Sequence, residues 1–184
     1  MFGVLRVQIG NRYFSDFPTS RCAELIALLA LAKCEPVPRS TVIASLWPES
    51  AIEECANRLS VTLSLLRKTL EAGFNEILIC EGKSLKLSDN VRTDWSDFWD
   101  EVREFNHAED PIAKLAASQS VQEIYHQPFM VDVAHSWATI ARSEAESAWK
   151  HTMTWQAHYT NNEALRLRVE SNFTLGQQSG VGPI

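Results

Sequence analysis

A stretch near the middle of the chain places hydrogen-bonding and basic side chains along one face of a predicted helix, at about residues 52–71. The polar and basic members of this face are Asn57, Arg58, Thr62, Ser64, Arg67 and Lys68. Amide and guanidinium groups can hydrogen-bond base edges in the major groove of DNA, and cationic groups can neutralise phosphates. Val61, on the same face, offers an apolar contact for a thymine methyl group. This pattern fits recognition of double-stranded DNA, and it fits equally well an ordinary core helix whose polar side faces water.

Two further sites carry groups suited to phosphate. Arg39 and Ser40 stand at the predicted start of a short helix, where main-chain N–H groups attract anions. Lys83 and Lys86 lie in the predicted hairpin 81–86, from which they could reach phosphates or a minor groove. The candidate DNA-binding residues therefore come from three separate segments of the chain.

The elements that must position these residues follow from hydrophobic periodicity. A hairpin is predicted over residues 4–14, a buried helix from Thr19 or Ser20, and a short helix from Ser40 to Trp47. The long helix has an apolar stripe with spacings of three and four. Its members are Ile52, Ala56, Leu59, Leu63, Leu66 and Leu70. A second hairpin then flanks the turn 81–84, and this order is typical of a winged helix-turn-helix.

The second half of the chain is predicted to be entirely helical. Helices are expected after Thr93-Asp94, after Asp110-Pro111 and from about Ser136 to Tyr159. In the last helix Trp137, Ile140, Ala141, Ala145, Ala148 and Trp149 are expected to face inward. The fold class is thus mainly α with small β elements. The predicted domains are 1–92 for the winged helix, 93–160 for a short all-α domain and 161–184 for a partly disordered extension.

Charge distribution agrees with this division. The net charge is −6, yet residues 1–95 carry 11 Lys and Arg against 11 Asp and Glu, whereas residues 96–184 carry 6 against 12. A neutral module is therefore followed by an acidic one. The aromatic stripe Trp95, Phe98 and Trp99 at the start of the acidic half is expected to pack in a core rather than to form a docking patch.

Motifs for catalysis, cofactors and metals are missing from the sequence. The seven glycines form neither a G-x-G-x-x-G nor a G-x-x-x-x-G-K-[ST] loop, and the five histidines form no H-E-x-x-H motif. His151 and His158 share a helix face, but two ligands do not complete a metal site. Four cysteines without a C-x-x-C pair are expected to be reduced and mostly buried. We therefore expect a cytoplasmic protein without a membrane span, which is not an enzyme and needs neither cofactor nor metal.

Several motifs also resemble a known family. Pro38-Arg39-Ser40 to Leu46-Trp47-Pro48, followed by Asn57 to Leu70 and the hairpin, resembles the OmpR/PhoB-type winged helix of SARP-type bacterial transcriptional regulators. The helix end S-x-L-R-K/R-x-L of that family is matched by Ser64, Leu66, Arg67, Lys68 and Leu70. Downstream, residues 94–99, 124–129 and 137–144, with Trp137 and Arg142, resemble the bacterial transcriptional activator domain.

The resemblance implies DNA binding, often to direct repeats. It further implies tetratricopeptide-like helix pairs that contact RNA polymerase, another protein or a second copy of the chain. It predicts that Arg67→Ala with Lys68→Ala lowers DNA affinity and flattens its salt dependence by about two units.

Two alternatives remain open. The long helix can be an ordinary core helix whose polar side faces water. The winged helix can also serve protein contacts through Val61 and Leu65 instead of binding DNA strongly.

Overall fold

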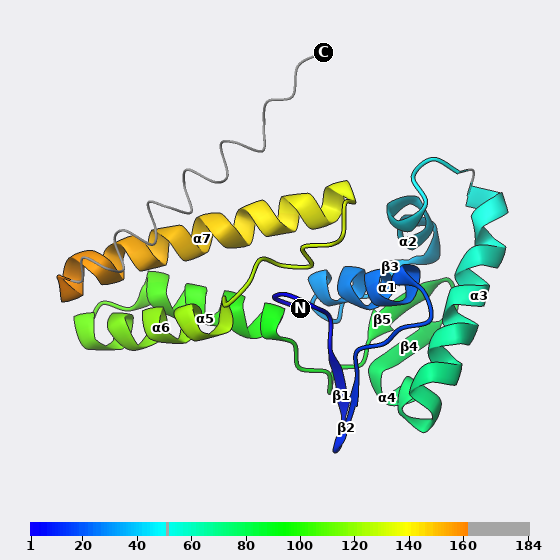
Figure 1. Ribbon diagram of the computed structural model, residues 1–184, viewed down its shortest axis with the longest axis horizontal. Helices are drawn as coiled ribbons and strands as arrows, with labels where there is room; N and C mark the ends of the chain where they lie inside the picture. Colours follow the sequence, from blue (N-terminus) through cyan, green and yellow to red (C-terminus); the bar gives the residue numbers. More distant parts are fainter. Residues whose placement is uncertain (51, 162–184) are drawn as a thin grey trace, which may run out of the picture. The chain divides into compact units, whose positions relative to one another are not determined.

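The computed structural model describes residues 1–50 and 52–161, which form a mainly helical chain with two small antiparallel sheets (Figure 1). The chain divides into two compact units. The first contains residues 1–97 and 127–142, and the second contains residues 98–126 together with the chain from residue 143. This division differs from the predicted boundary at residue 92, because residues 93–97 and 127–142 group with the first unit. Residues 162–184 of the predicted extension lie outside the described residues.

The predicted N-terminal hairpin is confirmed. Strands β1 (Val7–Ile9) and β2 (Arg12–Phe14) pair antiparallel, with Val7 opposite Phe14. Gly10 in the turn has a φ of +56°, a left-handed conformation that costs glycine little. Apolar and polar residues alternate along this segment, and Leu5 and Val7 are buried. The alternation thus places one side of the hairpin against the first unit's core.

Three helices form the core of the first unit. They are α1 (Ser20–Leu31), α2 (Arg39–Leu46) and α3 (Ile52–Leu70), and all three contact one another. The buried stripe of α3 consists of Cys55, Leu59, Leu63, Leu66 and Leu70. The prediction that Ala56 belongs to this stripe is wrong, since Ala56 is exposed. At about 100° per residue Cys55 lies closer than Ala56 to the line through Leu59 and Leu66.

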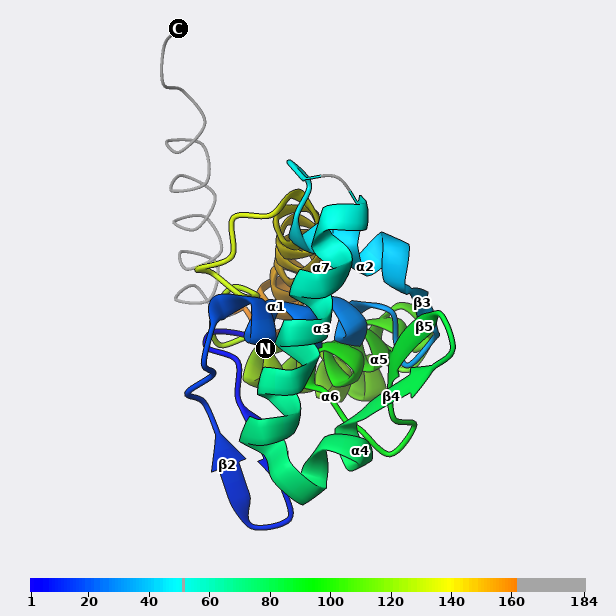
Figure 2. The ribbon, with the colours of Figure 1, turned by 90° about the vertical axis from the view of Figure 1, so that its right-hand side faces the viewer.

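A three-stranded sheet completes the first unit (Figure 2). After α3 come a 3₁₀ turn η1 (Glu71–Gly73) and a short helix α4 (Phe74–Ile77), which the sequence pattern did not predict. The predicted second hairpin follows as β4 (Leu78–Glu81) and β5 (Ser84–Leu87). Strand β3 (Val37–Pro38) lies between α1 and α2 in sequence and pairs with β5, so that the strand order is β3-β5-β4.

The second unit is built from α5, α6 and α7. Helix α5 (Asp94–His107) begins in the first unit, α6 (Pro111–Ile124) is capped by Asp110, and α7 (Ser136–Thr160) is the longest. Phe98 packs near Tyr125, which stacks on Trp149 with ring centroids 5.3 Å apart. The prediction that Ile140 faces inward is wrong, because its side chain is 59% exposed. None of the helices within the described ranges has the length and apolar character required to cross a membrane.

Residues 127–142 are held in the first unit by aromatic packing and one arginine. Phe129 packs against Trp95 with ring centroids 4.6 Å apart and lies next to Phe2. Arg142 Nε donates a hydrogen bond of 3.0 Å to the carbonyl oxygen of Phe129. Its Nη2 donates to the carbonyl oxygens of Met130, at 2.8 Å, and Val133, at 2.9 Å. Trp95 is therefore a core residue, as predicted, and Arg142 fixes the turn before α7.

Candidate nucleic-acid interface

The exposed face of α3 carries most of the side chains that the sequence singled out. Those with exposed side chains are Asn57, Arg58, Val61, Ser64, Arg67 and Lys68. Leu65 is half-buried beside them. Asn57, Val61, Ser64 and Lys68 recur at intervals of three and four residues, so they line one side of the helix.

Thr62 was predicted to contact DNA, but the structure places its side chain in the core. Its side chain is only 5% exposed, and its hydroxyl donates a hydrogen bond of 2.9 Å to the carbonyl oxygen of Arg58. On an ideal helix Thr62 lies at the edge of the polar face, and its methyl group and satisfied hydroxyl allow it to turn into the core. Thr62 is therefore not available to contact a base.

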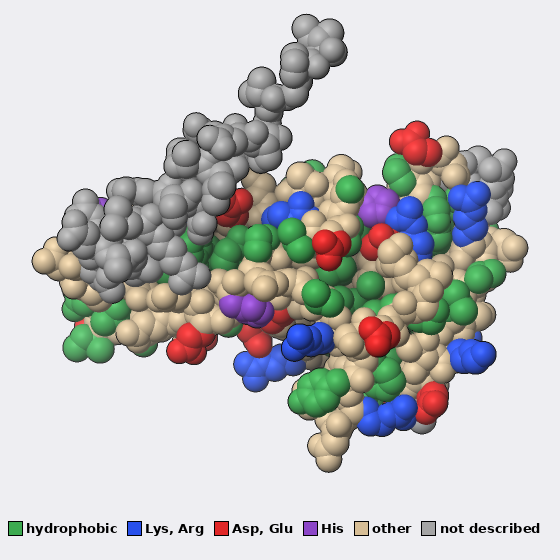
Figure 3. Space-filling model, viewed as in Figure 1, with side chains coloured by type: hydrophobic (Ala, Val, Ile, Leu, Met, Phe, Trp, Pro, Cys, Tyr) green, Lys and Arg blue, Asp and Glu red, His purple; other side chains and the backbone are tan. Residues whose placement is uncertain are grey.

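The basic side chains of α3 differ in how firmly they are held. Arg67 lies over the ring of Phe74, with its guanidinium carbon 4.6 Å from the ring centroid, while the side chain stays exposed. Arg58 donates a hydrogen bond of 3.3 Å to the hydroxyl of Ser50. Between Cys55 and Leu70 all the charged residues are basic, namely Arg58, Arg67 and Lys68. Figure 3 shows Lys and Arg side chains on the α3 side of the first unit.

The structure brings the start of α2 and the turn of the β4–β5 hairpin together. The main-chain N–H of Arg39 donates a hydrogen bond of 2.8 Å to the carbonyl oxygen of Lys83, and Pro38 is the register partner of Ser84. Ser40 and Lys83 are both exposed. The Nε atom of Arg39 is buried and has no hydrogen-bond partner among the residues that the structure describes. Predicted phosphate contacts that are 44 residues apart in sequence thus lie side by side.

Lys86 is placed differently from Lys83. Its ammonium group donates hydrogen bonds to both carboxylate oxygens of Asp89, at 3.1 and 3.3 Å, and its side chain is only 19% exposed. The hydrogen bond with Asp89 raises the pKa of Lys86 above its ordinary value. Lys86 is thus cationic at neutral pH but already compensated, and Lys83 is the uncompensated basic residue of this hairpin turn among the described residues.

The cysteines differ in part from the prediction. Cys22 and Cys55 are buried, Cys34 is partly buried and Cys80 is exposed, and all four are free thiols. Burial, followed by the charge of Asp89, raises the pKa of Cys34. In the described part of the chain His, Cys, Asp and Glu form no group of three that could hold a metal ion.

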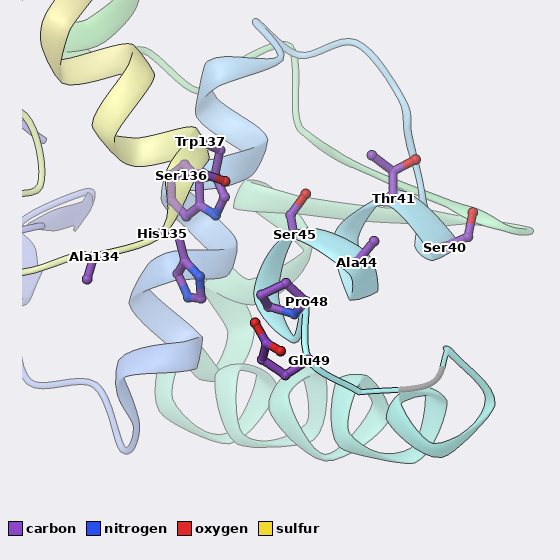
Figure 4. A pocket seen from close by; sticks show the side chains of 10 residues that line it. All are labelled: Ser40, Thr41, Ala44, Ser45, Pro48, Glu49, Ala134, His135, Ser136 and Trp137. Carbon is purple, nitrogen blue, oxygen red and sulfur yellow. The ribbon is translucent and has the colours of Figure 1, made fainter. Parts of the chain in front are cut away.

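A pocket next to α2 lies entirely within the first unit (Figure 4). Its volume is about 730 Å³. Ser40, Thr41 and Ser45 border it from α2. Trp137 borders it from the first turn of α7, and His135 is the residue just before that helix. The imidazole of His135 stacks near the Trp137 indole with centroids 5.9 Å apart.

A polar network that the sequence did not predict lies beside this pocket. Glu24 is buried in α1, and its Oε2 lies 3.1 Å from Nε2 of His135. Arg21 contacts both Glu24 and His135. These residues join α1 to residues 127–142, and because 111 residues separate Glu24 from His135, no local sequence pattern could have revealed the network.

Comparison of the sequence with models of protein families finds no matching family, and a search of the curated proteins finds no similar sequence.

Proposed function

We propose that this chain is a sequence-specific DNA-binding transcriptional regulator with a winged helix-turn-helix in its first unit. In this proposal α2 and α3 form the helix-turn-helix, α3 enters the major groove and the β4–β5 hairpin is the wing. The observation that carries the proposal is the exposed face of α3, which offers hydrogen-bonding groups and exclusively basic charges from Cys55 to Leu70. A double helix with a polyanionic backbone and hydrogen-bonding base edges matches both features.

The order of elements supports the same proposal. Helices α2 and α3 contact each other, and β3 anchors the β4–β5 hairpin beside the start of α2. A helix N-terminus attracts phosphate, and Arg39 and Lys83 meet there. The hairpin can therefore contact the backbone of the same duplex that α3 reads.

The number of uncompensated basic groups sets the strength of nonspecific binding. Five candidates remain once Lys86 is excluded because of its bond to Asp89, and they are Arg39, Arg58, Arg67, Lys68 and Lys83. If each of them neutralises one phosphate, the logarithm of affinity falls with the logarithm of salt concentration with a slope of about −4.5. This moderate slope is compatible with the nearly neutral charge of residues 1–95.

For the second unit we propose a role in protein contacts. Its helices and its acidic charge favour RNA polymerase, another protein or a second copy of the chain as partner. The same partners are implied by the resemblance of residues 94–99, 124–129 and 137–144 to the bacterial transcriptional activator domain, and these segments are divided between the two units. Together with the first unit this corresponds to a SARP-type regulator.

A second candidate function rests on one observation. Val61 is 52% exposed in the centre of the α3 face, next to the half-buried Leu65. A protein-interaction module that kept a winged-helix fold would use these apolar side chains to bind a protein.

Binding of the full chain to fluorescent random-sequence duplex DNA, measured by anisotropy at several salt concentrations, tests the proposal. Regulation through DNA predicts binding at low salt with a slope of about −4.5, followed by enrichment of a motif in selection from a random pool. An interaction module predicts no binding at low salt together with self-association or a stable protein partner. Salt-dependent binding would therefore support the DNA-binding function, and its absence at low salt would support the interaction module.

A further inference from the structure

Val61 differs from most apolar residues of α3 because its side chain is exposed to solvent. Apart from the half-buried Leu65, the other large apolar residues of this helix whose side chains the structure describes are buried, with Leu59 at 1%, Leu63 at 6% and Leu66 at 0% exposure. Val61, by contrast, is 52% exposed. The helix core is thus complete without Val61, and its side chain is available for a contact outside the chain.

The charges around Val61 restrict what such a contact can be. Arg58 lies three residues before it, and Arg67 and Lys68 follow within two turns, without an acidic residue between Cys55 and Leu70. Glu53 and Glu54 lie before Cys55, so the basic charge gathers around Val61 and toward the end of the helix. A partner that is anionic around its edge and apolar where it meets Val61 fits this part of α3. In the major groove the C5-methyl group of thymine is the one apolar group on the base-pair edges, and phosphates flank it.

We propose that Val61, with Leu65 beside it, reads thymine methyl groups, so that the preferred DNA site contains a thymine at one position or at two positions about two steps apart. This inference rests on the proposed DNA-binding function and adds the base that the centre of α3 selects. Thr62, the other side chain of this stretch with a methyl group for such a contact, is buried.

The spacing of the face supports this reading. Val61 and Leu65 are four residues apart, which corresponds to about 6 Å along the helix axis. Base pairs are stacked at about 3.4 Å, so the two side chains can serve thymines about two steps apart. Asn57 lies one turn before Val61 and has the amide that pairs with adenine. Asn57 and Val61 together favour an A·T-containing centre.

Deoxyuridine in place of thymine provides the test, because it removes only the 5-methyl group. A duplex is first selected from a random pool with the full chain, and each thymine is then replaced in turn. We expect about fourfold weaker binding at one or two thymines, the effect of losing one buried methyl group. In Val61→Ala the thymine and deoxyuridine duplexes should bind equally at the position that Val61 reads.

Val4→Ala is the matched control. Val4 is 60% exposed and belongs to the first unit but not to α3, so this variant should keep the preference for thymine. Melting curves of all variants verify that they fold.

Equal binding of all deoxyuridine duplexes would overturn the inference, as would a thymine preference that persists in both Val61→Ala and Leu65→Ala. Salt-dependent binding without any selected motif would also overturn it while leaving DNA binding intact. Failure to bind any duplex at low salt would refute the proposed function itself.

Discussion

The double variant Arg67→Ala/Lys68→Ala is the most direct perturbation of the proposed DNA interface. Both side chains are exposed, and Arg67 lies over the ring of Phe74, a cation–π contact worth about 0.5–1 kcal/mol at an exposed site. The variant should therefore fold. Two lost phosphate contacts reduce the slope of affinity against salt by about 1.8 units, and at 0.1 M salt this corresponds to about 60-fold weaker binding.

The assay is fluorescence anisotropy with one duplex across a series of salt concentrations, with circular dichroism to verify folding. Arg103→Ala/Lys150→Ala is the matched control, because it removes the same charge from α5 and α7 of the second unit. Its slope should equal that of the wild type. If the α3 variant is folded and binds with an unchanged slope, the end of α3 does not contact phosphates and the reasoning is refuted.

Three other substitutions test features of the first unit. Arg142→Met removes three hydrogen bonds to main-chain carbonyls and should lower the free energy of unfolding by about 2–4 kcal/mol in urea denaturation, whereas a loss below about 0.5 kcal/mol would show that water replaces them. Asp89→Asn removes a negative charge that raises the pKa of Cys34, so that pKa should fall and more thiolate should be present at a fixed pH. Alkylation of Cys34 by iodoacetamide at pH 8, followed by mass spectrometry, should become faster, and an unchanged rate would contradict the assignment. Gly73→Ala would place a methyl group against the side chain of Ile9 and should cost about 1–3 kcal/mol, part of which the added change Ile9→Ala should restore if this overlap is the cause.

The sequence was most informative where one helix or hairpin could be treated by itself. The stripe from Leu59 to Leu70 predicted the end of α3 because four apolar residues repeat with the helical period. The two hairpins were predicted because a glycine turn separates extended segments in each. Strand β3 was missed, since a strand of two residues, one of them a proline, carries no detectable strand pattern.

Side chains at the border of a helix face were less predictable. Thr62 can satisfy its hydroxyl within the helix, so it is as suited to the core as to the surface. Ile140 shows the opposite error, because an apolar residue at the edge of a stripe can be left in solvent. Periodicity assigns the centre of a face but leaves its edges to packing.

The positions of the basic residues outside α3 depend on contacts between segments that are distant in sequence. Arg39 meets Lys83 only because β3 pairs with β5, and each residue alone is an ordinary surface cation in the sequence. Likewise, Lys86 is a predicted phosphate contact by its type, but Asp89 compensates it. The number of free basic groups, and with it the expected salt dependence, therefore required the structure.

The first unit, for which DNA binding is proposed, includes residues 127–142 in addition to residues 1–97. Phe129 packs with Trp95, and His135 reaches the buried Glu24 in α1, the helix that packs against α2 and α3. A segment that follows α5 and α6 in the sequence thus completes the core that supports α3. Loss of residues 127–142 would remove His135 from this network and would leave Glu24 paired with Arg21 of the same helix. The unit that positions α3 is therefore assembled from two separate stretches of sequence, and a charge or composition boundary near residue 92 cannot define it.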